Sequence, residues 1–304
     1  MGSKKRLLNL ISENIKGDKV IDACSGSGVV TQHLTKNKKV ISCDILYFPG
    51  AIINGSIGVS NKINEIKTLL GKANSLKGKQ GFFYNNYTND RTYFTEENAA
   101  ILDEYREFCE NIPDFKLKNY MLYVGMESLS RAANTTGLQA CFLKKFKTPA
   151  ARKIEFRLED HYEGESEFHR TGIIEFLENY QDFDTIYLDP PYNQRQYGKT
   201  YHLYETFIRN DNPEIFGKTG QRKILDEPSK FCKLYECENE FKKLVSLCKN
   251  KTILISYNSE GNLPKEKFIN LFNAECIEFD FRRYKSLSHE KENKVKEYLF
   301  VINT

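Results

Sequence analysis

The residues best suited to chemistry are Asp189-Pro190-Pro191-Tyr192, which directly follow an apolar run over 184–188. Two consecutive prolines lack backbone N–H groups and hold the chain extended. The Asp189 carboxylate and the Pro190 carbonyl are therefore expected to face a cleft as hydrogen-bond acceptors, with Tyr192 beside them. Two acceptors suit a planar amine, because they bind its two hydrogens and favour a pyramidal, nucleophilic nitrogen. A stacked tyrosine would hold the base in place for in-line transfer.

A glycine-rich turn, Ala23-Cys24-Ser25-Gly26-Ser27-Gly28, follows the apolar run over 19–22 and precedes a predicted helix. Glycines at this point let the backbone pass close to a ligand. Asp44 ends the next apolar run, where an acid commonly binds ribose hydroxyls. The turn lacks the third glycine of a dinucleotide fingerprint and the Lys-Ser/Thr of a phosphate-binding loop. The pattern therefore favours a nucleoside, and adenosine joined to a sulfonium amino acid fits it.

These residues need a scaffold that brings the strand ends together. Apolar runs over 19–22, 39–44, 184–189 and 251–257 predict strands buried on both faces, and helical spacing appears over 7–15 and 173–180. The pattern predicts an α/β fold with an open, mostly parallel sheet covered by helices on both faces. Ligands in such sheets bind beyond the carboxyl ends of the strands. Two further runs, 276–283 and 297–302, predict a terminal antiparallel hairpin.

The stretch over 47–153 differs in composition and is rich in Asn, Lys, Tyr and Gly. Helical spacing is visible in it over 102–108 and 120–133. We interpret 1–46 and 154–304 as the catalytic domain and 47–153 as an insertion. Because sequence readout requires side chains in the major groove, we expect the insertion to recognise the target sequence.

Composition limits the class of protein. The 304 residues carry a formal net charge of +4, which permits a nucleic-acid partner but does not establish one. None of the eight cysteines forms a C-x-x-C pair, so zinc spacing is absent and no metal is expected. The sequence shows no signal-peptide pattern and no long apolar run. We expect a cytoplasmic protein with reduced thiols.

Basic and aromatic residues alternate directly after the reacting tetrapeptide. Such mixtures line nucleic-acid grooves, although a solvated loop is the alternative. A second basic segment comprises Lys144-Lys145-Phe146-Lys147 with Arg152 and Lys153, and it is equally compatible with solvated surface. The residues expected to contact DNA are Arg195, Tyr197, Lys199, Tyr201 and His202.

Several segments resemble the adenine-amine DNA methyltransferases of the alpha motif order, a class that includes Dam-like and type II modification methylases. In that class the cofactor turn precedes D-P-P-Y. The similarity includes Gly2-Ser3-Lys4, Asp22 to Gly28, Asn134-Thr135-Thr136-Gly137, Asn193-Gln194-Arg195-Gln196-Tyr197, Asn212-Pro213, Ser256-Tyr257-Asn258 and Arg283-Tyr284-Lys285-Ser286.

The resemblance implies a Rossmann-like fold with a seven-stranded sheet and S-adenosylmethionine as the methyl donor. It further implies a flipped adenine in double-stranded DNA and a restriction-modification setting, with a cognate endonuclease as a possible, separately acting partner. Asp189, Pro190, Pro191 and Tyr192 would be catalytic. The implied cofactor-binding residues are Lys4, Asp22, Cys24, Gly26, Gly28, Asp44, Ile45 and Gly172.

The sequence departs from the family pattern at Gly172. Related families place an acid before the helix that precedes the D-P-P-Y strand, where it meets the cofactor's adenine amine. Three alternatives stay open at this stage. D-P-P-Y is also compatible with an amine methyltransferase of RNA, with a catalytically silent DNA-binding module, or with a Pro-Pro turn in which Asp189 caps a helix.

Overall fold

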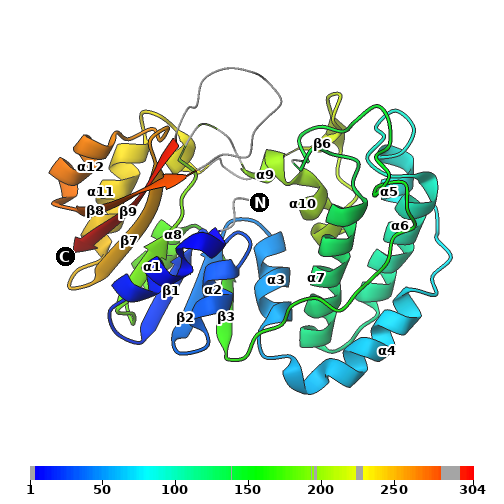
Figure 1. The fold of residues 1–304 in the computed structure, drawn as a ribbon, viewed down its shortest axis with the longest axis horizontal. Helices are drawn as coiled ribbons and strands as arrows, with labels where there is room; N and C mark the ends of the chain where they lie inside the picture. Colours follow the sequence, from blue (N-terminus) through cyan, green and yellow to red (C-terminus); the bar gives the residue numbers. More distant parts are fainter. Residues whose placement is uncertain (1–3, 138, 193, 195–196, 224–228, 282–294) are drawn as a thin grey trace.

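A computed structural model describes residues 4–137, 139–192, 194, 197–223, 229–281 and 295–304. Within these ranges, seven strands form one sheet in the order β3-β2-β1-β4-β7-β9-β8 (Figure 1). The strands are β1 (Lys19–Ala23), β2 (Lys39–Asp44), β3 (Ser166–Arg170), β4 (Thr185–Leu188), β7 (Thr252–Asn258), β8 (Glu275–Phe281) and β9 (Val295–Asn303).

The sheet is parallel from β3 to β7, and β9 lies antiparallel between β7 and β8. The predicted α/β fold with a mostly parallel sheet and a terminal antiparallel hairpin is thereby confirmed. The sequence reasoning did not identify β3, because its Ser-Glu-Phe-His-Arg sequence lacks the continuous apolar character of the inner strands. As an edge strand it has one central apolar residue, Phe168, which lies against Gly50.

Alternate residues of the inner strands pack into two different cores, as a strand period of two requires. Ile186 and Leu188 contact one core and Tyr187 the other. Helices α8 (Ile173–Asn179), α11 (Cys237–Leu247) and α12 (Lys265–Phe272) contribute to the first core. Helices α1 (Leu8–Asn14) and α2 (Val29–Leu34) contribute to the second, with the short helix η1 (Lys4–Leu7) beside them.

A helical lobe fills the connection between β2 and β3 and lies beside the sheet (Figure 1). Its first helix, α3, contacts both β3 and α7, so it joins the sheet to the lobe. The chain over 154–165 still packs on the lobe, and α10 with the small strands β5 and β6 joins it from the far side of the sequence. These elements are α3 (Phe48–Ser56), η2 (Ser60–Lys62), α4 (Ile63–Ala73), α5 (Phe82–Asn86), α6 (Glu96–Glu110), α7 (Phe115–Ala132), α10 (His202–Arg209), β5 (Ile215–Phe216) and β6 (Gln221–Arg222).

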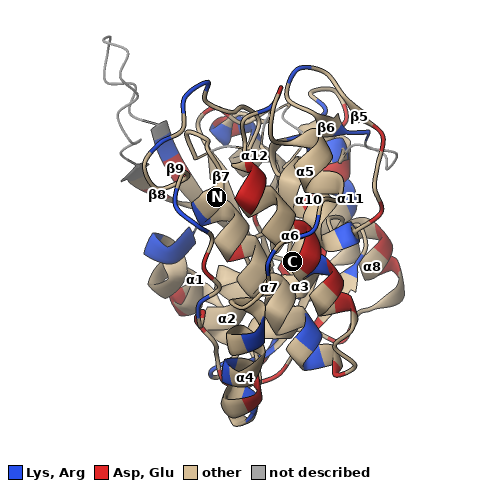
Figure 2. Ribbon diagram, turned by 90° about the vertical axis from the view of Figure 1, so that its right-hand side faces the viewer, with Lys and Arg blue, Asp and Glu red and all other residues tan. Residues whose placement is uncertain are grey.

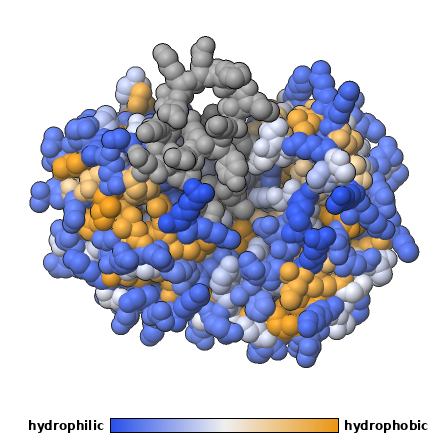
Figure 3. All heavy atoms as spheres, in the orientation of Figure 1, coloured by the Kyte–Doolittle hydropathy of each residue, from blue (hydrophilic) through white to orange (hydrophobic). Residues whose placement is uncertain are grey.

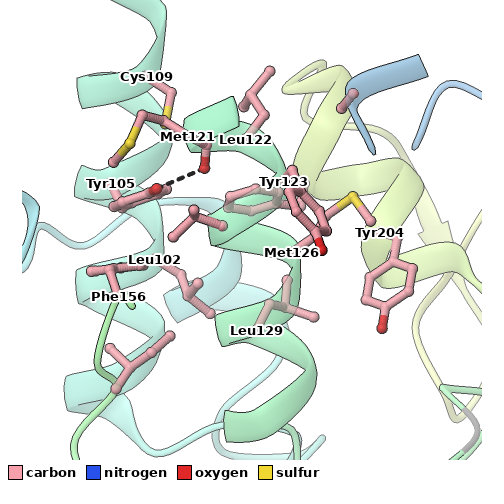
Figure 4. Packing of buried hydrophobic residues seen from close by; sticks show 14 of the residues in the cluster. Leu102, Tyr105, Cys109, Met121, Leu122, Tyr123, Met126, Leu129, Phe156 and Tyr204 are labelled. Carbon is pink, nitrogen blue, oxygen red and sulfur yellow. Dashed lines mark hydrogen bonds between the residues drawn. The ribbon is translucent and has the colours of Figure 1, made fainter. Parts of the chain in front are cut away.

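The lobe has its own aromatic core (Figure 4). Tyr105 of α6 stacks on Phe156 with ring centroids 3.8 Å apart, and its hydroxyl donates to the Met121 carbonyl at 2.6 Å. Tyr204 of α10 reaches the same core. A lobe with its own core can hold its surface in a fixed orientation beside the sheet.

In the described part of the chain, no helix is long and apolar enough to cross a membrane.

The junction between α3 and α7 depends on Gly55. A Cβ atom at this position would lie 2.5 Å from the Asn119 carbonyl. The two helix backbones therefore approach more closely than any side chain would allow. This contact fixes how the lobe is attached to the sheet.

We predict that Gly55→Ala destabilises the fold by about 1–3 kcal/mol, because α3 and α7 must separate. The matched control is Gly71→Ala in α4, where an added Cβ meets nothing within 4 Å. That change should stabilise the protein by about 0.5–1 kcal/mol, as replacement of an exposed helical glycine does. Urea unfolding monitored by circular dichroism measures both effects. Shifts in the same direction for the two variants would contradict the proposed junction.

Candidate active site

The parallel register brings three functional segments to one edge of the sheet. Ala23 of β1 lies beside Cys43 of β2 and Leu188 of β4. The residues that follow these three along the sequence are Cys24, Asp44 and Asp189. The glycine turn, the predicted ribose acid and the reacting tetrapeptide therefore leave the sheet side by side, as the sequence predicted.

The turn after β1 is held by backbone contacts. Ser25 N donates to the Cys43 carbonyl at 3.2 Å, and Gly28 N donates to the Ser25 carbonyl at 2.8 Å. Gly26 and Gly28 have φ angles of 47° and 69°, in the left-handed region that favours glycine. Cys24 also has a positive φ, 59°, and burial raises the pKa of its thiol well above the ordinary value. A neutral thiol in this position forms part of the wall.

Asp22 anchors the turn from below. Gly28 is the N-cap of α2 and has no side chain to satisfy the helix amides. The Asp22 carboxylate replaces it by accepting from Thr31 N at 3.0 Å and from Thr31 Oγ1 at 2.6 Å. Burial raises the pKa of Asp22 to about 7, and the Thr31 contacts oppose that rise. This residue supports the turn in addition to lining the cavity above it.

Asp44 holds the opposite side of the turn. Its carboxylate accepts from Gly26 N at 3.0 Å and from Leu46 N at 2.9 Å. Burial raises the pKa of Asp44 to about 6, whereas the backbone donors favour the ionised form. An acid fixed in this way is oriented before any ligand arrives.

A cavity of about 720 Å³ connects these segments. Its volume lies within the range of about 300–1,000 Å³ typical of small-molecule sites. Most of the predicted site residues share it, from the cofactor end to the DNA-contact segment. Those that line it are Lys4, Asp22, Cys24, Gly26, Asp44, Ile45, Gly172, Asp189, Pro191, Tyr197, Lys199 and Tyr201. Gly28, Pro190, Tyr192 and His202 are outside this lining, and Arg195 lies outside the described residues.

Lys4 connects the reacting acid to the terminal strand. Its ammonium lies 3.3 Å from Asp189 Oδ1 and 3.4 Å from Glu297 Oε2 of β9. Burial raises the pKa of Asp189, and the nearby Lys4 charge opposes this rise. Burial disfavours the charged form of Lys4, but the two carboxylates more than offset this, so its pKa is raised. The ammonium therefore favours the ionised, acceptor form of Asp189.

Aromatic rings flank the tetrapeptide on both sides. The Tyr192 carbonyl accepts from Asn262 N at 2.8 Å, and its ring meets Tyr257 edge-on at 6.5 Å. Tyr197 of α9 (Tyr197–Thr200) stacks on Tyr201, with ring centroids 6.0 Å apart. The half-buried Tyr192 is thus fixed by the sheet, whereas Tyr197 and Tyr201 approach the cavity from the lobe.

His202 is placed differently from its neighbours. It is fully buried in the lobe, and its Nε2 lies 2.9 Å from the Gln139 carbonyl. Burial lowers its pKa to about 4. The first turn of α10 directs Tyr201 to the cavity and His202 into the core. The predicted DNA contact of His202 is therefore incompatible with its burial, and we do not retain it.

Several cavity or site residues were not anticipated from the sequence, among them Glu175, Phe48 and Glu297. Glu175 lines the cavity one turn after Gly172, on the side where an acid was expected. Phe48 lines it from the start of α3. Glu297 is paired with Lys4 across 293 positions of the chain, so no local pattern could reveal it. A search for acids within one helical turn of Gly172 would have identified Glu175.

Comparison with known proteins agrees with this arrangement. The family model of the D12 class N6 adenine-specific DNA methyltransferases matches residues 1–271. The chain belongs to this family. The matched region includes the cofactor turn, Asp44 and the D-P-P-Y tetrapeptide. The resemblance deduced from the sequence motifs is confirmed.

Curated relatives are type II enzymes. The chain is 30% identical to the type II methyltransferase M.FokI of Planomicrobium okeanokoites, over 99% of this chain and 52% of that protein. It is 28% identical to M.NlaIII of Neisseria lactamica, over 99% of this chain and 98% of that protein. The modification methylase LlaI of Lactococcus lactis subsp. lactis is 29% identical over 89% of this chain and 48% of its own length. The chain therefore spans about half of two of these relatives.

Proposed function

We propose that this protein transfers a methyl group from S-adenosylmethionine to the exocyclic amine of adenine in double-stranded DNA. The observation that carries the proposal is the single cavity that joins the Asp44 pocket to Asp189 of D-P-P-Y. Membership of the D12 family supports the same reaction. The names of the relatives as type II methyltransferases support a site-specific role in restriction-modification, beside a separate endonuclease.

The residues present fit the cofactor. Asp44 faces the cavity as a fixed acceptor suited to ribose hydroxyls, and Ile45 exposes 38% of its surface as an apolar contact for a purine. Ser25 Oγ is buried and has no hydrogen-bond partner within the described structure, so a ligand group can satisfy it. Related families have an acid at the position of Gly172 that meets the adenine amine. In this chain Glu175 can supply that carboxylate. The carboxylates of Asp22 and Asp189 favour a cationic ligand.

The protein residues prepare the target amine. S-Adenosylmethionine supplies an electrophilic methyl group when bound. The Asp189 carboxylate and the Pro190 carbonyl accept the two amine hydrogens, which withdraws the nitrogen lone pair from the ring. Positive charge that develops on this nitrogen is stabilised by the same acceptors. Tyr192 stacks on the base and restricts its orientation. No covalent enzyme intermediate is required, so none of the eight cysteines is needed for the reaction.

The adenine must leave the duplex to reach this site. Tyr197, Lys199 and Tyr201 lie where an extruded nucleotide would enter, and the Lys199 side chain is exposed. The basic segment over 144–153 is also exposed and belongs to a loop held on the lobe. The Gln139 side chain of this loop accepts from the first amides of α10, Leu203 N at 3.1 Å and Tyr204 N at 3.3 Å.

We propose that the lobe reads the target sequence. Helix α9, whose Tyr197 and Lys199 line the cavity, lies beside α10 of the lobe (Figure 1). Lys and Arg residues occur on several loops, and Asp and Glu residues occur on the helices (Figure 2). Hydrophilic residues also dominate the face shown in Figure 3, and hydrophobic residues form separate patches there. A polar surface with basic loops suits phosphate contacts and base edges.

Asp189→Ala tests the reaction directly. We expect methyl transfer from labelled cofactor to plasmid DNA to fall by at least about 10²–10³-fold, because a transition-state acceptor is lost. Binding of S-adenosylhomocysteine should remain largely intact. The control is Asp182→Ala, which removes a carboxylate that is exposed in its pair with Lys19. Full activity of Asp189→Ala would exclude the mechanism.

The same assay distinguishes the alternatives. Transfer to RNA or to protein, without transfer to DNA, would replace DNA as the substrate. Binding of DNA and cofactor without transfer to any acceptor would indicate a silent binding module. Single-molecule sequencing of the methylated plasmid would then identify the target sequence.

Lys4→Met should alter the pH dependence. Burial raises the pKa of Asp189 and Lys4 opposes that rise, so loss of the ammonium raises the pKa further. The carboxylate is the active form. The acid limb of kcat/KM for DNA should therefore move to higher pH, measured at saturating cofactor. Lys19→Met, which removes a more exposed lysine, should leave the limb in place. An unmoved or lowered limb in Lys4→Met would contradict the assigned ion pair.

Lys199→Ala tests the phosphate contact. We expect weaker DNA binding with a salt slope reduced by about one, as loss of one phosphate contact predicts. The control is Lys67→Ala on α4, an exposed lysine at the far end of the lobe from α9 (Figure 1). Fluorescence anisotropy across a salt series measures both slopes. Equal slopes for Lys199→Ala and the wild type would remove Lys199 from the interface.

A further inference from the structure

One face of α10 contacts both ends of the cavity. Tyr201, Glu205 and Arg209 are spaced by four residues, which places them on the same side of a helix. Tyr201 lines the cavity near the tetrapeptide. Glu205 and Arg209 contact the segment that follows Asp44. The helix therefore connects the proposed base-binding end to the proposed cofactor-binding end.

Glu205 accepts hydrogen bonds from the amides at the start of α3. Its Oε1 accepts from Tyr47 N at 2.8 Å and from Phe48 N at 3.0 Å, and only 4% of the residue is exposed. The amide before these, Leu46 N, donates to Asp44 at 2.9 Å. Three consecutive amides are thus held by two carboxylates. A displacement of Glu205 would be transmitted through this short segment to the acid proposed to bind ribose.

Ring contacts reinforce the same connection. Phe48 meets Tyr201 and Tyr204 edge-on, with ring centroids 5.6 Å apart in each case. The Tyr47 ring lies between two guanidinium groups, Arg209 at 4.7 Å and Arg170 at 4.4 Å. Arg170 ends β3, two residues before Gly172. The contacts of α10 therefore reach both the ribose side and the adenine side of the cavity.

Glu205 caps the start of α3, but helix capping alone does not explain why it lies between α10 and the segment after Asp44. Asp103 performs the same capping in the lobe, where it accepts from Phe83 N and Tyr84 N at 2.9 Å each, at the start of α5. Neither Asp103 nor Glu205 lines the cofactor cavity, but Glu205 holds the amides of the segment after Asp44, which includes the lining residue Phe48. A buried carboxylate loses hydration, which raises the pKa of both Glu205 and Asp103. The two residues share this capping chemistry but differ in what they connect.

We propose that Glu205 is a positioning residue that couples cofactor binding to binding of the target nucleotide. Contact of the extruded base with Tyr201 orders α10. Glu205 then holds the segment over 46–48, and with it Asp44, in the orientation that the cofactor requires. The inference rests on the proposed function, because it assigns the two cavity ends to these ligands. Coupling of this kind is reciprocal, so each ligand strengthens the other by the same factor.

The test measures that factor by calorimetry on the full chain. S-Adenosylhomocysteine is titrated into the protein alone and into the protein saturated with a duplex. The duplex contains the target sequence identified on the plasmid. We expect the wild-type dissociation constant to fall by about 5–100-fold when the duplex is present. Glu205→Gln keeps the size of the side chain and one acceptor oxygen but removes the charge. The factor should drop at least about threefold towards one, and titration of duplex with and without S-adenosylhomocysteine should show the same drop.

Asp103→Asn is the control, because it weakens a carboxylate cap of the same kind elsewhere. Its coupling factor should equal the wild-type factor, even if its thermal stability falls as much as that of Glu205→Gln. If Glu205→Gln does not fold, Glu205→Asp retracts the carboxylate by one methylene and should also lower the factor. An unchanged factor in the Glu205 variant, an equal loss in Asp103→Asn, or a wild-type factor of one would overturn the inference. Failure of the proposed function would look different, since the wild type would neither bind S-adenosylhomocysteine nor methylate DNA.

Discussion

Parallel pairing of β1 with β2 on one side and with β4 on the other determines where every reactive group of the sheet lies. The register places Ala23 beside Cys43 and Leu188, so Cys24, Asp44 and Asp189 leave the sheet together. A slip of one residue would exchange the two faces of β4 and move Tyr187 into the wrong core. The apolar packing that selects the register therefore also sets the spacing of the carboxylates. The chemistry of the site depends on the hydrophobic core beneath it.

Carboxylates that lie together at one edge of the sheet repel one another, and the structure stabilises them in two ways. Asp22 and Asp44 are held by neighbouring donors, from Thr31 and from the amides of Gly26 and Leu46. Asp189 instead faces the ammonium of Lys4, a flexible side chain that Glu297 also attracts. Fixed amides hold a carboxylate in one orientation, whereas an ammonium shared between two carboxylates can shift towards one of them. Asp189 is thus the member of the set that can exchange its partner for the amine of a substrate.

Local sequence patterns could predict the parts of the site that lie on contiguous segments. The apolar strands, the turn at Gly26 and the tetrapeptide at Asp189 are each visible within a few residues. The edge strand β3 was missed because an edge needs little apolar character. The pairing of Lys4 with Glu297 joins opposite ends of the chain, which a local pattern cannot show. His202 was expected at the surface because it follows the tetrapeptide, yet the rotation of one residue along α10 directs it into the lobe core.

Tyr192 and Tyr201 are close in sequence but pack on different bodies, the sheet and the lobe. Tyr192 packs on Tyr257 of the sheet, whereas Tyr201 packs on Phe48 and Tyr204 at the edge of the lobe. The separation of Tyr192 and Tyr201 therefore depends on how α3 and α10 pack on each other. Surfaces of the lobe away from this contact can change without altering that separation, because the lobe has its own core. If the lobe reads the target as proposed, this division permits recognition to diversify while the geometry at Asp189 stays constant.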